Sequence, residues 1–199
     1  SRIEWLSFVN DGDIRLRSKK ELRDHQIKAL EAVKEGLEKD DRGKMIMACG
    51  TGKTLTSLRI AEEIAGEGKL VLYMVPSLAL MSQTIREWKN DANNDFIAFS
   101  ACSDEKVGRR RLSDDIIEIS LQDLAIPATT DTEKLSKQIK IKKTDDSKMI
   151  VVFSTYQSID VISKSQSDYG LGEFDLIICD EAHRTTGATL QGGDESHFV

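Results

Sequence analysis

The sequence of 199 residues is poor in cysteine and proline, with only three and two of them, respectively. Cys49, Cys102 and Cys179 are far apart and include no CxxC pair. This odd, scattered set favours a reducing, cytoplasmic setting over a disulfide framework. We expect at least Cys49 and Cys179 to behave as small apolar residues in strands. The three histidines lack the spacing of metal ligands, so no zinc site is predicted.

Long apolar segments are also missing. The most apolar stretch, around Leu70 to Met81, is interrupted by Pro76 and Ser77 and is too short to cross a bilayer. The first residues, Ser1 to Glu4, do not have the pattern of a signal peptide and are typical of a cut inside a longer protein. We therefore expect no membrane partner.

Basic charge is in deficit, since 28 Lys and Arg stand against 34 Asp and Glu, for a formal net charge of −6. This counts weakly against nucleic-acid binding but allows a protein that holds a strand through a small local patch and neutral hydrogen bonds. Hydrophobic residues make up 39% of the chain, enough to bury a core. We predict a core over residues 22–199 and an N-terminal arm over residues 1–21 that docks on it.

Short apolar runs alternate with amphipathic segments along most of the chain. Helical spacing of apolar residues predicts helices over 22–39, 54–65, 77–90, 132–141 and 156–163. Short apolar runs predict strands over 45–49, 70–75, 96–99, 149–153 and 174–179. This order predicts an α/β fold, with a mostly parallel sheet covered by helices on both faces.

A glycine-rich turn follows the first predicted strand and opens the next predicted helix. Its residues are Gly50, Thr51, Gly52, Lys53 and Thr54. The glycines allow backbone N–H groups to point at phosphate oxygens, and the helix N-terminus adds partial positive charge. Lys53 is expected to reach the β- and γ-phosphates of ATP, and Thr54 to place its hydroxyl on Mg²⁺. The strict pattern GxxxxGK[ST] has glycine where this chain has Met47, so a purely structural turn is the alternative.

Two adjacent carboxylates, Asp180 and Glu181, end the last predicted strand. Ligands of open α/β sheets bind beyond the C-terminal ends of the strands. Asp180 is expected to hold Mg²⁺ through water, and Glu181 to orient and deprotonate the attacking water. Alone, such a pair could be solvated turn residues, but here a phosphate loop lies upstream on a separate strand. His183 and Arg184 follow, with a role in coupling to nucleic acid or as plain turn residues.

Together these motifs resemble the first RecA-like lobe of superfamily 2 helicases and translocases, a P-loop NTPase fold. LRDHQ at 22–26 resembles the glutamine motif, in which Gln26 would read the adenine edge and Arg23 would support it. VPSLAL at 75–80 and FSTYQS at 153–158 resemble the motifs that contact the nucleic-acid backbone. The residues that would contact DNA are Pro76, Ser77, Gln83, Ser154, Thr155 and Tyr156. An ordinary turn or helix cap is the alternative for each of these two motifs.

A finer resemblance rests on MACGTGKT, STYQS and DEAHRTTGA, which look like the motor of type ISP restriction–modification enzymes. It implies a bacterial DNA-cleaving protein that uses ATP and Mg²⁺ and moves along double-stranded DNA without needing to unwind it. It also implies partners on the same polypeptide, namely a second RecA-like lobe, a nuclease, a methyltransferase and a target-recognition domain. No separate nuclease pattern is distinguishable in this sequence.

Other functions remain open from the sequence. A strand-separating helicase shares every nucleotide motif, a nucleotide-dependent switch would bind ATP without using DNA, and a structural domain would have a degenerate loop. The lysines over Lys134–Lys143 fit a solvated helix face or a basic patch beside DNA. Because an arginine from a second lobe accelerates such hydrolysis by ~10³–10⁵, we expect slow turnover by this chain alone.

Overall fold

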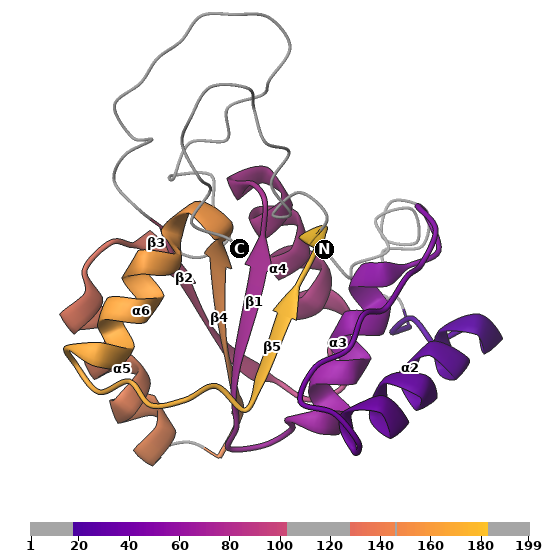
Figure 1. Cartoon of the computed structure of the whole chain (residues 1–199), viewed down its shortest axis with the longest axis horizontal. Helices are drawn as coiled ribbons and strands as arrows, with labels where there is room; N and C mark the ends of the chain where they lie inside the picture. The colour runs from indigo at the N-terminus through magenta and orange to yellow at the C-terminus, as the bar shows by residue number, and fades with distance from the viewer. Residues whose placement is uncertain (1–17, 103–127, 146, 183–199) are drawn as a thin grey trace, which may run out of the picture.

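The structure, a computed structural model, describes residues 18–102, 128–145 and 147–182 (Figure 1). Its centre is a five-stranded sheet in the order β3-β2-β4-β1-β5. The strands are β1 (Leu70–Val75), β2 (Phe96–Ala101), β3 (Ala128–Thr129), β4 (Met149–Thr155) and β5 (Leu176–Cys179). Every neighbouring pair is parallel, so all the strands end at the same edge of the sheet.

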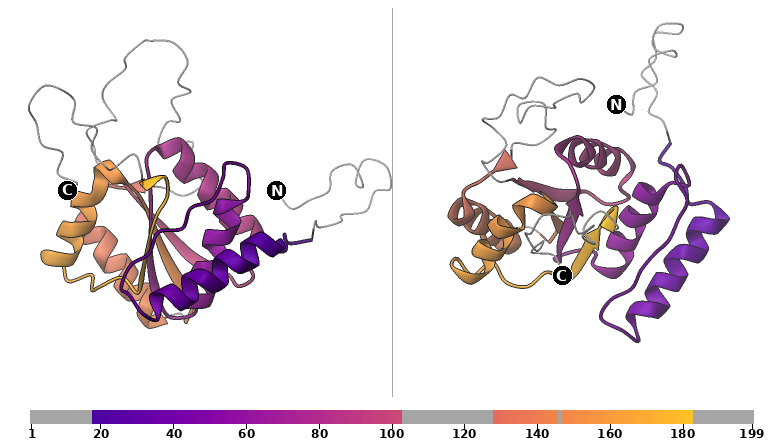
Figure 2. Two further views of the ribbon diagram at one scale, coloured as in Figure 1. Left: turned by 45° about the vertical axis from the view of Figure 1, so that its right-hand side comes forward. Right: turned by 45° about the horizontal axis from the view of Figure 1, so that its top comes forward.

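Helices cover both faces of this sheet (Figures 1 and 2). They are α2 (Asp24–Leu37), α3 (Lys53–Ile64), α4 (Leu78–Asp91), α5 (Thr132–Asp145) and α6 (Ile159–Ser167), with a short 3-10 turn η3 (Tyr156–Ser158). α3 and α4 pack on one face, α5 and α6 on the other, and α2 lies against α3. The predicted α/β class and the largely parallel sheet are confirmed.

β1 shows why both faces are apolar. Side chains alternate along a strand, so Val71, Tyr73 and Val75 share a core cluster with α3 and α4. Leu70 and Leu72 belong to the cluster under α5 and α6. All six residues of β1 are buried, as expected for a central strand of a parallel sheet.

The predicted buried strand over residues 45–49 was wrong. These residues form no strand, and the side chain of Ile46 is 82% exposed. A strand requires a neighbour with which to exchange backbone hydrogen bonds, and within the described ranges none lies beside this segment. β5, the last strand of the sheet, likewise exposes Ile177 to 54%.

The cysteines also differ from the expectation. Cys49 is exposed in the phosphate loop rather than packed in a strand, and Cys179 is exposed although it lies in β5. Cys102 is the buried member of the set. All three are free thiols.

Most other elements were predicted with small errors at their ends. The expected helix over 156–163 begins as η3 and continues as α6, and the helix expected over 132–141 runs on to Asp145. The strand expected from residue 174 starts at Leu176. In the part of the chain that the structure describes, no helix is long and apolar enough to cross a membrane.

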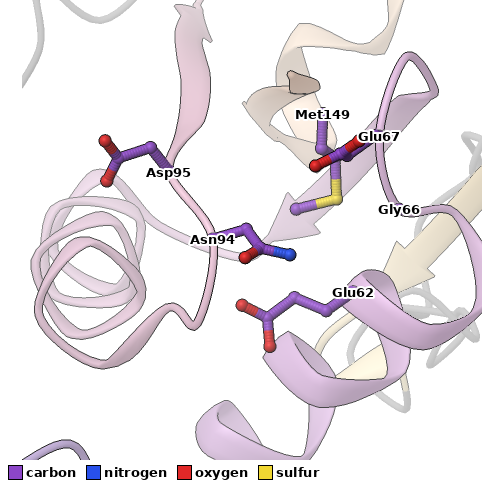
Figure 3. A pocket seen from close by; sticks show the side chains of 6 residues that line it. All are labelled: Glu62, Gly66, Glu67, Asn94, Asp95 and Met149. Atoms are coloured by element: carbon purple, nitrogen blue, oxygen red, sulfur yellow. The ribbon is translucent and has the colours of Figure 1, made fainter. Parts of the chain in front are cut away.

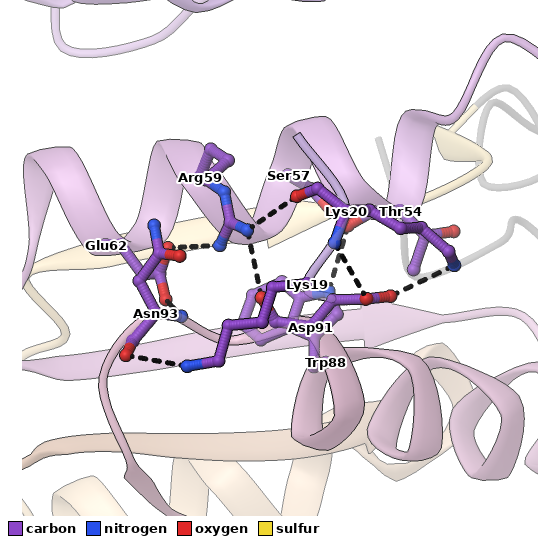
Figure 4. Close-up of polar contacts among 9 residues, drawn as sticks. All are labelled: Lys19, Lys20, Thr54, Ser57, Arg59, Glu62, Trp88, Asp91 and Asn93. Carbon is purple, nitrogen blue, oxygen red and sulfur yellow. Dashed lines mark hydrogen bonds and ion pairs between the residues drawn. The ribbon is translucent and has the colours of Figure 1, made fainter. Parts of the chain in front are cut away.

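The segment before α2 is tied to α3 and α4 by a polar cluster (Figure 4). The guanidinium of Arg59 donates to the carbonyls of Lys20 and Asp91, at 3.2 and 2.9 Å, and to Glu62 Oε2 at 2.6 Å. Lys20 Nζ lies 3.0 Å from Asp91 Oδ2. Residues 18–20 therefore dock on the core, while the division at residue 21 stays a prediction and residues 1–17 lie outside the described part.

Candidate nucleotide-binding site

The phosphate loop and the paired carboxylates meet at the C-terminal edge of the sheet. Nζ of Lys53, the first residue of α3, lies 2.5 Å from Oε1 of Glu181, which follows β5. The two side chains are 29% and 25% exposed, so a ligand can reach both. The hydrogen bond with Glu181 raises the pKa of Lys53, burial opposes this, and the charges of Glu181 and Asp180 add to it. Lys53 thus stays a cation, the state that binds phosphate.

The loop itself adopts a conformation that glycine favours. Gly50 and Gly52 have φ angles of 76° and 85°, in the left-handed region. Gly52 is also the N-cap of α3, so the residues that follow it present backbone N–H groups at a helix N-terminus. The hydroxyl of Thr51 closes the turn by donating to the carbonyl of Ala48 at 2.7 Å.

Gln26, predicted to read adenine, is buried and bonded to the phosphate loop. Its Nε2 donates to the carbonyl of Gly52 at 3.1 Å and to Oγ1 of Thr56 at 3.2 Å. Its Oε1 accepts from the N–H of Arg23 at 2.9 Å, where α2 begins. The adenine contacts of Gln26 and Arg23 stay predictions. The structure adds a role that the sequence reasoning missed, because Gln26 joins the start of α2 to the phosphate loop.

The backbone of Asp180 is fixed by two hydrogen bonds. Its N–H donates to the carbonyl of Met74 at 2.9 Å, and its carbonyl accepts from the hydroxyl of Tyr156 at 2.8 Å. Glu181, the next residue, has a φ of 53°, the one positive φ among the described residues other than glycine. Residues other than glycine adopt this left-handed conformation infrequently, and it is found preferentially at functional sites.

The residues present fit a nucleotide-bound Mg²⁺. Thr54 offers a hydroxyl at the start of α3, and Asp180 offers a carboxylate, both oxygen ligands of the kind that Mg²⁺ takes. No group of three or more His, Cys, Asp or Glu in the described ranges is placed to hold a metal ion. A cation held by one or two protein oxygens, with phosphate and water completing its shell, does not require such a group.

The residues predicted to contact DNA lie at the same edge of the sheet, where β1 and β4 end. Val75 pairs with Thr155, so Ser77 and Tyr156 leave adjacent strands. Oγ of Ser77 accepts from the N–H of Leu80 at 3.3 Å and so caps α4. This cap was the alternative considered for that motif, and it leaves a contact of Pro76 or Ser77 with phosphate as a prediction.

The remaining DNA predictions fall on residues with different exposure. Gln83 is exposed and bonds with Glu87, at 2.8 Å. Ser154 and Thr155 are buried, and the hydroxyl of Thr155 lies 2.8 Å from that of Ser158. A contact of these two with DNA would need such bonds to open, and it too stays a prediction. His183 and Arg184 lie outside the described residues.

A small hollow opens at the opposite edge of the sheet, where the strands begin (Figure 3). It is lined by Glu62, Gly66, Glu67, Asn94, Asp95 and Met149. Its acidic lining repels phosphate, and none of the predicted site residues lies in it. The residues predicted to bind nucleotide lie at the other edge, where β1, β4 and β5 end.

Comparison with protein families gives one match over most of the chain. The family described as "Type III restriction enzyme, res subunit" matches residues 19–195. The probable helicase A859L of African swine fever virus (isolate Pig/Kenya/KEN-50/1950) is 28% identical over 180 residues, covering 90% of this chain and 18% of the viral protein. Its counterpart in isolate Tick/South Africa/Pretoriuskop Pr4/1996 is 30% identical over 163 residues, or 82% of this chain and 16% of that protein.

Two solved structures resemble the fold and are each 40% identical in sequence. The ATP-dependent type ISP restriction-modification enzyme LlaBIII, bound to DNA, aligns with a TM-score of 0.79 over 94% of this chain and 12% of its own. A nuclease-deletion mutant of the type ISP enzyme LlaGI, in complex with a DNA substrate mimic, aligns with a TM-score of 0.67 over 82% of this chain and 15% of its own. The chain thus spans 12% of the LlaBIII chain and 18% of the viral helicase of the Kenya isolate.

Proposed function

Because this chain belongs to the family of the type III restriction enzyme res subunit, and is a first lobe of the superfamily 2 helicase type, we propose that it binds ATP and Mg²⁺ in a DNA-dependent motor. The motor would translocate on double-stranded DNA within a restriction–modification enzyme. One observation supports this most strongly. Lys53 and Glu181, 128 residues apart in sequence, are brought within 2.5 Å of each other where the sheet ends.

The proposed chemistry follows from four residues. On ATP binding, Lys53 would exchange the Glu181 carboxylate for the β- and γ-phosphate oxygens. Glu181 would then be free to orient a water molecule and accept its proton. Thr54 and Asp180 would hold Mg²⁺, which when bound neutralises charge on the phosphates.

DNA is the proposed partner because both solved structures described above are type ISP enzymes that contain DNA or a DNA mimic. Contacts from the ends of β1 and β4 would reach phosphates, so they would carry no information about base sequence. The second RecA-like lobe, nuclease and methyltransferase belong to the proposal for the longer protein. The lysine-bearing α5 stays undecided between a solvated face and a DNA contact, since Lys137, Lys142 and Lys143 are exposed there.

Two substitutions separate binding from hydrolysis. Lys53→Ala should lower the affinity for a fluorescent ATP analogue by at least about tenfold, since a charge-assisted contact contributes about 1.5–3 kcal/mol. Glu181→Gln should bind the analogue at least as well as the wild type, because the carboxylate that competes for Lys53 is neutralised. In a two-lobed protein the same Glu181→Gln change should abolish hydrolysis. Full turnover by that variant would show that Glu181 is not the base.

The DNA preference is tested by ATP turnover in a chain extended to include the next lobe. Linear double-stranded and single-stranded DNA would be compared at equal nucleotide concentration. Stimulation mainly by the duplex is the expected result. Stimulation mainly by single strands would indicate a strand-separating helicase, and stimulation by neither would indicate a nucleotide switch. The chain of 199 residues, assayed in parallel, should turn over slowly with either DNA.

A further inference from the structure

The hydrogen-bond ladder between β1 and β5 stops at the first of the two paired carboxylates. The last paired residues are Met74 and Cys179. The N–H of Asp180 still donates to the carbonyl of Met74, at 2.9 Å. In a parallel ladder the next bond would run from the N–H of residue 76 to the carbonyl of Asp180. Residue 76 is a proline, which has no N–H, so β1 offers this carbonyl no donor.

Tyr156 supplies the missing donor from a different strand end. Its hydroxyl donates to the carbonyl of Asp180 at 2.8 Å. Tyr156 is 8% exposed and opens the η3 turn after β4, and its ring belongs to the core cluster that also contains Met74. Burial raises the pKa of Tyr156, so the phenol stays protonated and able to donate. Phenylalanine would fill the same space, so the core explains the ring of Tyr156 but not its hydroxyl.

The bond fixes the peptide unit that carries Glu181. The carbonyl of Asp180 and the N–H of Glu181 belong to one planar peptide, which rotates as a unit. Glu181 has a φ of 53°, a left-handed conformation that costs free energy in a residue other than glycine. Rotating this peptide by half a turn would relax the φ, but it would also break the bond with Tyr156. The hydroxyl therefore holds the backbone in the conformation from which Glu181 reaches Nζ of Lys53.

We propose that Tyr156 is a positioning residue for Glu181, whose hydroxyl locks the peptide between Asp180 and Glu181 so that the Glu181 carboxylate points at the phosphate loop. The proposal rests on the function proposed above, in which Glu181 orients the attacking water. It assigns the Tyr156 hydroxyl to the backbone of the lobe instead of to DNA. Without the hydroxyl, the carboxylate spends less time in the orientation that hydrolysis needs, while ATP still binds.

Kinetics of the full-length protein that contains this lobe, at saturating linear duplex DNA, test this role. Tyr156→Phe keeps the ring and removes the hydroxyl, and a thermal melt verifies that the fold persists. kcat for ATP hydrolysis should fall by about five- to tenfold, the effect of one hydrogen bond, with KM for ATP changed by less than about twofold. Tyr169→Phe is the matched control, because it removes the hydroxyl of an exposed tyrosine and should change neither constant. An unchanged kcat for Tyr156→Phe would overturn the proposal.

A DNA titration in the same assay separates positioning from a DNA contact. If the hydroxyl touched a DNA phosphate, Tyr156→Phe would need more DNA for half-maximal stimulation and would regain the full kcat at saturation. That result would overturn the proposal. If the wild-type protein shows no ATP turnover, the proposed function itself fails. If the wild type turns over ATP and Tyr156→Phe matches it, only the role of Tyr156 is refuted.

A structural measurement needs only the 199-residue chain. In amide NMR spectra of Tyr156→Phe without nucleotide, the resonance of Glu181 should shift or broaden, because its peptide can now rotate. The amide of Asp180 belongs to the preceding peptide and donates to Met74, so its protection from hydrogen exchange should stay within about threefold of the wild type. An unchanged Glu181 resonance would overturn the proposal. So would loss of protection at Asp180, which would indicate general loosening of the sheet edge.

Discussion

Gln26 illustrates how a single residue can connect two parts of a site. Both ends of its side-chain amide are hydrogen-bonded within the chain. Oε1 accepts from Arg23, and Nε2 donates to Gly52 and Thr56. The motif around it predicted a contact with the nucleotide base, but its bond with the phosphate loop depends on how α2 packs on α3. The spacing of residues in the sequence does not show how α2 packs on α3, so the bond between Gln26 and the phosphate loop could not be predicted from it.

Gly52 is the residue whose replacement tests this connection. A Cβ atom added to Gly52 would lie 2.5 Å from Nε2 of Gln26, and the φ of 85° would also be strained. Gly52→Ala should therefore lower the free energy of unfolding by about 2–3 kcal/mol, measured by urea denaturation.

Gly50 provides a matched control for that substitution. Its φ of 76° is similarly strained, but an added Cβ would meet nothing within 4 Å. Gly50→Ala should cost only the strain, about 1–2 kcal/mol. Equal costs for the two substitutions would show that the contact between Gln26 and the loop is unimportant for stability.

At the scale of helices and strands, the sequence predicted β1, β2 and β4 well because strands flank them on both sides. β1 was predicted at its observed bounds, and it pairs with a strand on each side, β4 and β5. The failure at residues 45–49 has the same cause. Ile46 belongs to an apolar run, but within the described ranges no strand pairs with it. An apolar pattern predicts that a segment tends to form a strand, and the availability of a neighbouring strand decides whether it does.

The start of β5 depends on one carboxylate. Oδ2 of Asp175 accepts from the N–H of Leu70 at 2.9 Å, and Oδ1 accepts from Nζ of Lys69 at 3.0 Å. Burial alone would raise the pKa of Asp175, but the bonds from Leu70 and Lys69 outweigh it and hold the pKa below its ordinary value of 3.8. Because the pKa of Asp175 is lower in the folded than in the unfolded protein, its charged form stabilises the fold at pH values above the unfolded-state pKa. This stabilisation is lost as the pH falls through the folded-state pKa.

Asp175→Ala should therefore lower the free energy of unfolding by about 1–2 kcal/mol near neutral pH. The difference from the wild type should shrink once the pH falls below the ordinary value of 3.8, when the wild-type carboxylate becomes protonated. Urea denaturation at neutral and at acidic pH measures both values. Glu173→Ala, at an exposed position just before it, should have little effect at either pH. If Asp175→Ala lowered the free energy of unfolding by the same amount at both pH values, the charge of Asp175 would not be what stabilises the fold.

For the whole molecule, the topology brings the motifs that were predicted to bind nucleotide to one edge of the sheet. The motifs around Lys53 and Glu181 were predicted to act together, and the parallel sheet brings them to one edge. What could not be predicted is the support behind that edge. The bond from the Tyr156 hydroxyl to the Asp180 carbonyl joins residues on two strand ends, and the sequence predicted Tyr156 as a DNA contact rather than as this support.

The position of β5 at the end of the sheet has a practical consequence for handling the lobe. Among the described residues no strand covers its outer side, where Ile177 is more than half exposed. Uncovered strand edges are templates for pairing between molecules. We expect concentrated solutions of the lobe to self-associate through β5, and air oxidation of the exposed Cys179 thiol to make such contacts permanent. Reducing agent and low protein concentration would then decide whether a preparation stays monodisperse.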